Sequence, residues 1–426
     1  MSDTTRPLNG AEARRLVQSI ASDHGHIAQE VLDRMSDADR REVEHALRMK
    51  DQLISSTVVT LARNLYTSNA RFVLELLQNA EDNDFTQAQE HGETPKVSFS
   101  VYPNHVVVEC NEDGFTERNL RAICNVGKSS KLEAQGYIGE KGIGFKSVFM
   151  AAYRVHIHAT PDENARRNQT IRQQFHEIHD TVLLFMRKIQ EIKIEFYDQE
   201  KDEADEPVMT ITHSIDRQGA MASCKKHTSE LGREQTQLRH YHITKHTTTD
   251  LAKAEGRNYS EVEETTSAYS QSEVVLAFPV TAASVPVLEN QWVFAFLPVR
   301  QMGFKFLVQA DFVTQANRQD IVTTSARNQG LATGVADAFI QGVVELCDHP
   351  ELRYQWMRYL PEESAYPWDG FWTQVIEEIR GRLTSTPVLC PAIPGPLQLI
   401  RDSRRHKASH LDASDDNVRP HFEGQK

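Results

Sequence analysis

A short stretch of acidic, amide and apolar residues offers the clearest chemistry in this sequence. Residues 71–83 read RFVLELLQNAEDN, and the spacing of the apolar residues predicts a helix. Glu75, Asn79 and Asp82 are four and then three positions apart, so they share one helix face. An amide oxygen can bind Mg2+, and a carboxylate one turn away can act as a general base towards water. Taken alone, the stripe reads more simply as the solvated face of an amphipathic helix.

Two later segments supply what a triphosphate needs. An apolar run over 106–110 predicts a strand, which ends in the polar turn Asn111-Glu112-Asp113-Gly114-Phe115. The glycine-rich loop 139–146, GEKGIGFK, then opens an apolar helix, and backbone N–H groups at such a position cradle phosphates. Each loop alone is weak evidence for a nucleotide site. The hypothesis rests on the order in which the loops follow the first helix. Positive charge near these loops comes from Lys128, Lys131, Lys141 and Lys146.

Composition narrows the class of protein. The 426 residues are 39% hydrophobic and 25% charged, as in globular domains. A net charge of -13 argues against generic nucleic-acid binding, which needs a basic surface. Five scattered cysteines without a C-x-x-C pair favour reduced thiols. We find no signal peptide and no apolar run of membrane-spanning length, so we expect an intracellular protein, cytoplasmic or nuclear, without a membrane segment.

The predicted organisation has four parts. Several local expectations accompany it: a helix over 171–189, a polar loop or insertion over 217–236, and an aromatic cluster at 354–372 that packs as core or interface. His240, His242 and His246 are read as surface residues of a strand. The parts are a helical arm over 1–54, a nucleotide domain over 55–160, a second α/β domain over 161–350 with a polar insertion at about 217–272, and a helical segment with a disordered tail over 351–426.

Three stretches together resemble the GHKL ATPase superfamily. They are LELLQNAEDN, NEDGFTERNLRAICNVGKSSK and GYIGEKGIGFKSVF, in the family's order. More narrowly they resemble the sacsin and NO VEIN branch, particularly large fungal proteins that carry such an ATPase domain. Residues 293–328 are similar, more loosely, to the region that follows the ATPase domain in sacsin-type proteins.

The resemblance implies an α+β chain with a Bergerat fold, an α/β sandwich whose mixed sheet carries helices on one face, followed by the second α/β domain. It implies ATP and Mg2+ as cofactors. Glu75 matches the general base, Asn79 the magnesium ligand, and Asp82 the acid that holds the nucleotide through water. The other nucleotide-binding positions that it implies are Asn111, Asp113, Gly114, Asn125, Lys128, Ser129, Gly139, Gly142, Gly144, Phe145 and Lys146.

Two departures from the family pattern matter. The usual adenine-reading motif is Asp-x-Gly-x-Gly, whereas this chain has Asn111 in the place of the aspartate, which leaves the adenine contact open between Asn111 and Asp113. After the glycine loop the fold usually continues through several strands. Here only a strand over 154–159 is expected before Pro161. The nucleotide domain is therefore either without its last strands or completed by later ones.

The polar stripe of the helix, the two loops and the resemblance together favour Mg-dependent ATP binding with slow hydrolysis and a chaperone-like conformational cycle. The alternative is a non-catalytic interaction scaffold, and a DNA-repair type of ATPase is disfavoured by the acidic balance. The implied partners are ATP, an unidentified protein partner or client, and a second copy bound through the N-terminal arm. Arg318 is a candidate phosphate contact, with a structural salt bridge as its plainer role.

Overall fold

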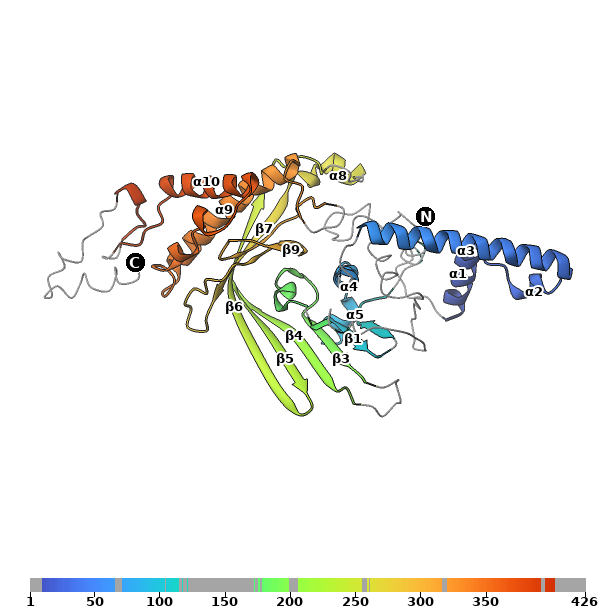
Figure 1. Cartoon of the computed structure of the whole chain (residues 1–426). Helices are drawn as coiled ribbons and strands as arrows, with labels where there is room; N and C mark the ends of the chain where they lie inside the picture. The colour runs from blue at the N-terminus through green and yellow to red at the C-terminus, as the bar shows by residue number, and fades with distance from the viewer. Residues whose placement is uncertain are drawn as a thin grey trace. The chain divides into compact units, whose positions relative to one another are not determined.

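The computed structural model divides the chain into two compact units (Figure 1). The first comprises Met1–Glu177 with Phe196–Glu206, and the second comprises Ile178–Glu195 with Pro207–Lys426. The architecture is α+β, with ten strands in a mixed sheet, as expected from the sequence. The residues that the structure describes are 10–65, 71–103, 105–114, 117, 121, 172, 175–176, 178–198, 206–254, 259, 261–315, 320–391 and 395–402.

The first unit begins with three helices. They are α1 (Gly10–Asp23), α2 (Gln29–Leu32) and α3 (Asp37–Leu65). Ser36 caps α3, because its Oγ accepts from the backbone N–H of Asp39 at 3.2 Å and donates to the Asp39 carboxylate at 2.7 Å. The capping side chain of Ser36 and the acidic residues Asp37 and Asp39 of the first turn thus mark the start of α3 in the sequence. Met49, Leu53 and Ile54 stand exposed on α3.

The rest of the first unit packs a helix against a hairpin. The helix predicted over 71–83 is confirmed as α4 (Arg71–Glu81), and β1 (Lys96–Val101) pairs antiparallel with β2 (Val106–Cys110). Phe175 is fully buried between the two, with its ring 6.2 Å from Phe72 of α4 and 5.0 Å from Phe99 of β1. The short helix α5 (Thr86–Glu90) is not predicted by the sequence, because its residues TQAQE have no apolar period.

The expected helix over 171–189 is wrong in its second half. Asp180–Phe185 form only a short 3-10 helix, η2, and β3 (Glu191–Phe196) follows at once. Every residue of η2 is buried, so its apolar run reflects burial on all sides rather than a helical stripe. In β3 the buried residues Ile192, Ile194 and Phe196 alternate, as the period of a strand requires.

The second unit is built on a mixed sheet. From β4 the order is β4-β5-β6-β7-β10-β8-β9. Neighbours pair antiparallel except β8 and β10, which are parallel. The strands are β4 (Met209–Gln218), β5 (Met221–Glu230), β6 (Arg233–Thr248), β7 (Ser272–Val280), β8 (Trp292–Ala295), β9 (Leu297–Gln301) and β10 (Leu307–Gln309).

The loop predicted over 217–236 is wrong, because most of these residues belong to strands. Residues 221–248 form the long hairpin of β5 and β6, and a short helix, α8 (Glu261–Thr266), follows. Leu231 and Gly232 make the two-residue turn with φ of 47° and 78°. β7 pairs with β6 only from His240 onward, so Arg233–Arg239 pair with β5 alone and are exposed. In Figure 1 this tip lies far from α9 and α10.

Two helices carry the core of the second unit. α9 (Ala326–Asp348) packs on β6 and β7, and α10 (Gly370–Ser385) packs on α9. α9 is the one helix of the described ranges that is long and apolar enough to cross a membrane, and its apolar residues are packed in this core. The aromatic cluster predicted at 354–372 is confirmed as core: Trp356, Tyr359 and Trp372 are buried.

The reading of the β6 histidines as surface residues is wrong for His242. Its side chain is 6% exposed, and its Nε2 lies 3.1 Å from Glu345 Oε2, on α9. Thr244 donates to the same oxygen at 2.6 Å. Burial raises the pKa of Glu345, but its hydrogen bonds from His242, Thr244 and Gln341 outweigh burial and lower that pKa. Polar side chains thus line part of the contact between α9 and the sheet.

Glycines let α9 lie close to β6. A Cβ at Gly334 would overlap Thr248 Oγ1 and lie 3.0 Å from Thr248 Cβ. We expect Gly334→Ala to destabilise the second unit by about 1–3 kcal/mol, because the helix must move off the strand. Gly381→Ala on α10 is the matched control: its Cβ meets nothing within 4 Å, and alanine should stabilise that helix by about 0.5–1 kcal/mol. Urea unfolding followed by tryptophan fluorescence measures both. Equal effects at the two positions would contradict the close contact.

Candidate functional site

The polar face of α4 is buried rather than solvated. Glu75 is 2% exposed and Asp82 is 6% exposed, while Asn79 between them is half-buried. Burying a carboxylate costs several kcal/mol unless it is paired or hydrogen-bonded. The simpler reading of this stripe, an ordinary solvated helix face, is therefore wrong. Two carboxylates and an amide thus share a largely buried face at this helix.

The end of α4 is joined to the turn that follows β2. Asn83 donates from its amide to the carboxylate of Glu112. The backbone N–H of Asp113 donates to the carbonyl of Asp84 at 2.8 Å. The first and second motifs, which are separated in the sequence, are thus adjacent in the structure. Sequence reasoning did not identify Asn83 and Glu112, because no periodicity or turn signal links them.

The two candidate adenine contacts both bind backbone groups. Asn111 accepts from the N–H of Lys96 at 2.8 Å and donates to the carbonyl of Thr94 at 3.0 Å, so it fixes the start of β1. Asp113 accepts from the N–H groups of Thr86 and Gln87 at 3.1 and 2.9 Å, at the start of α5.

Gly114 has a φ of 89°, a conformation that glycine adopts without strain. It lets the chain leave the turn directly after Asp113. The thiol of Cys110, at the end of β2, stays protonated at neutral pH, because burial and then the nearby Glu112 carboxylate raise its pKa to about 12. The Cys110 thiol is therefore not a nucleophile at this site.

The remaining predicted positions lie outside the described residues, as do Arg318, the predicted strand at 154–159 and the tail beyond 402. Within the described ranges, no three His, Cys, Asp or Glu side chains are arranged to hold a metal ion. A Mg2+ ion at Asn79 would take its other ligands from phosphate and water, which is how Mg2+ is usually held. The predicted positions outside the described ranges are Asn125, Lys128, Ser129, Gly139, Gly142, Gly144, Phe145 and Lys146.

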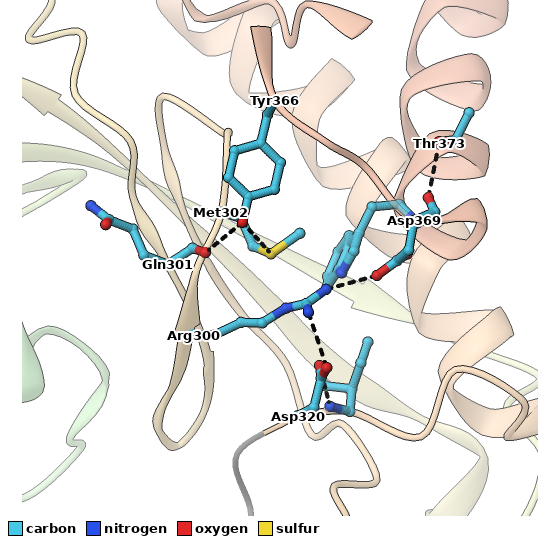
Figure 2. Close-up of polar contacts among 9 residues, drawn as sticks. Arg300, Gln301, Met302, Asp320, Tyr366, Asp369 and Thr373 are labelled. Carbon is cyan, nitrogen blue, oxygen red and sulfur yellow. Dashed lines mark hydrogen bonds and ion pairs between the residues drawn. The ribbon is translucent and has the colours of Figure 1, made fainter. Parts of the chain in front are cut away.

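In the second unit, Arg300 joins three segments (Figure 2). It donates from one nitrogen to Asp320 at 3.0 Å and from the other to Asp369 at 2.7 Å. Asp369 also caps α10 by accepting from the N–H of Trp372 at 3.1 Å. Asp320 comes two residues after Arg318 in the sequence.

A second buried polar cluster lies between η2 and the sheet. His213 of β4 is 1% exposed, and no described residue hydrogen-bonds either of its ring nitrogens. Burial, and next the charge of Lys226, lower the pKa of His213 to about 4. Asp180 accepts from Arg239 Nε at 3.1 Å and lies 3.2 Å from His179 Nδ1. In the sequence, the burial of His213 is signalled only by its alternation with Ile211 and Ile215.

Comparison with known proteins agrees with part of the resemblance. No family model matches the sequence. The chain is 25% identical over 398 residues to Protein NO VEIN of Arabidopsis thaliana, an alignment that covers 77% of this chain and 13% of that protein. The chain therefore corresponds to a small part of its relative's length. It is related to Protein NO VEIN, as the motifs predicted.

Proposed function

We propose that the first unit binds Mg-ATP in the manner of a GHKL domain and hydrolyses it slowly. One observation carries the proposal: Glu75 of α4 and Asp82, the residue directly after α4, are both buried, and Asn79 lies between them on the same face. The contact of α4 with the turn after β2 supports it, because it brings the first two motifs together. The similarity to Protein NO VEIN also supports it, because the motifs resemble those of the sacsin and NO VEIN branch.

Each residue has a distinct role in the proposal. Asn79 binds the magnesium ion through its amide oxygen, and the ion neutralises phosphate charge. Glu75, one turn earlier on α4, accepts a proton from the attacking water. Asp82 holds the nucleotide through a bound water.

Mg-ATP is expected to stabilise the wild-type chain, by about 2.7 kcal/mol at a hundredfold excess over its dissociation constant. Asn79→Ala should abolish the part of that stabilisation that depends on Mg2+. Thermal unfolding with ATP, with and without Mg2+, measures it. The exposed amide Gln89 on α5 gives a matched control, since Gln89→Ala should respond as wild type does. If Asn79→Ala shows the same Mg-dependent shift as wild type, Asn79 is not the magnesium ligand.

A non-catalytic scaffold is the second candidate. The observation in its favour is that Asn111 and Asp113 already bind backbone groups of β1 and α5. No stabilisation by millimolar Mg-ATP would select this candidate. Under either function we propose an intracellular protein that binds a protein partner. A second copy is one such partner, and the exposed Met49, Leu53 and Ile54 of α3 favour the N-terminal arm as its contact.

A further inference from the structure

Two thiols of the second unit lie side by side at the end of α9. Cys347 occupies the last turn of α9, and Cys390 lies in the segment that follows α10. The Cys347 thiol donates to the carbonyl of Val388 at 3.1 Å. The Cys390 thiol donates to the carbonyl of Cys347 at 3.6 Å. Each sulfur therefore touches the backbone of the other's segment, and both thiols are reduced.

The two sulfurs differ in exposure and in the charges around them. Burial raises the pKa of both thiols. The neighbouring Cys390 then raises the pKa of Cys347 further, and Asp348 adds to this. For Cys390, the hydrogen bond with Cys347 and the charge of Arg353 partly offset burial, whereas Asp348 raises its pKa. Cys390 is also partly exposed, whereas Cys347 is only 5% exposed.

We propose that Cys347 and Cys390 are a redox modification site that forms an intrachain disulfide by exchange with a small-molecule disulfide. The Cys390 thiolate attacks one sulfur of the small disulfide, and the first small thiolate leaves. The Cys347 thiolate then attacks Cys390 in the mixed disulfide, and the second small thiolate leaves. The two small thiolates take up the two protons that the cysteines lose. The small disulfide is thereby reduced by two electrons and the cysteine pair is oxidised by two.

The bond would fasten the chain after α10 to the end of α9. The loop that it closes contains the whole of α10 and the aromatic residues Trp356, Tyr359 and Trp372. Constraining such a loop disfavours the unfolded chain. The exchange should be slow at neutral pH, because a raised pKa leaves little thiolate. Its rate should rise about tenfold per pH unit while both thiols remain mostly protonated. None of the residues named here takes part in the proposed nucleotide binding, since all of them belong to the second unit.

The test uses the full reduced chain treated with oxidised glutathione at pH 7, 8 and 9. Mass spectrometry of peptides from non-reduced protein should find Cys347 joined to Cys390. The thermal midpoint reported by tryptophan fluorescence should rise and return to its original value with dithiothreitol. Cys390→Ser should lose both effects, and Cys224→Ser, which alters another buried thiol, should keep them.

Two results would overturn the proposal. One is glutathione attached to Cys390 without further exchange, which would mean that the sulfurs do not meet. The other is a free Cys347 thiol after long treatment at pH 9. Both results are read from the wild-type chain. They can therefore be obtained even if Cys390→Ser folds poorly.

Discussion

Replacing Glu75 with glutamine is expected to lower ATP turnover by about 100- to 10,000-fold, the usual contribution of a positioned general base. Glutamine keeps the shape of the side chain, which is 2% exposed on α4, but it cannot take the proton from water. Binding of Mg-ATP should persist, because Asn79 and Asp82 are intact. Phosphate release from labelled ATP at saturating Mg-ATP measures turnover, and the thermal shift measures binding.

Glu81 provides the matched control for this change. It lies on the same helix and is 3% exposed, so Glu81→Gln also removes a buried carboxylate. Turnover in Glu81→Gln should stay near that of wild type. If Glu75→Gln hydrolyses ATP as fast as wild type, Glu75 is not the base. If both variants lose turnover equally, the loss reflects the charge balance of α4 rather than proton transfer.

The second unit is expected to lose about 3 kcal/mol of stability as the pH falls from about 6.5 to about 4. In the unfolded chain His213 takes up a proton near its ordinary pKa, whereas the folded unit keeps it neutral until about pH 4. The unfolded state thus binds more protons throughout this window, so stability falls with pH and levels off below it. The estimate follows from about 1.4 kcal/mol per unit of pKa.

The four tryptophans of the chain make this measurement specific. Trp292, Trp356, Trp368 and Trp372 all belong to the second unit, so urea unfolding followed by their fluorescence reports that unit. His213→Leu should remove the part of the pH dependence that comes from His213 and leave that of His179, whose pKa burial also lowers. It should raise stability at pH 7, because a buried polar group without hydrogen bonds costs about 1–3 kcal/mol. His227→Gln on β5 is the control and should keep the wild-type slope. A wild-type slope in His213→Leu would contradict the assignment.

The sequence predicted those elements whose burial leaves a period. α4 was predictable because its apolar residues recur at helical spacing, and β1 because its apolar residues Val97, Phe99 and Val101 alternate with polar ones. The apolar run at 182–186 has neither period, so its 3-10 turn was mistaken for part of a helix. The β5–β6 hairpin is polar on both faces near its tip, so nothing in its residues distinguished it from a loop.

The candidate site was predictable in part for a similar reason. The shared face of Glu75, Asn79 and Asp82 follows from helix geometry alone. Their burial does not, because it depends on segments that lie elsewhere in the sequence. The capping of α5 by Asp113 and the contact of Asn83 with Glu112 also join distant positions, and no local pattern encodes such pairs.

The exposed end of the β5–β6 hairpin has a consequence for how this chain can change over evolution. Between the turn and His240, β5 and β6 pair without β7, and Arg233–Arg239 are exposed. Inserting or deleting one residue in each strand beside Leu231 and Gly232 would move only the tip. The register between β6 and β7 would remain, since it is set from the other end of β6. Hairpin length is thus free to vary among relatives while the core that it grows from keeps its residues.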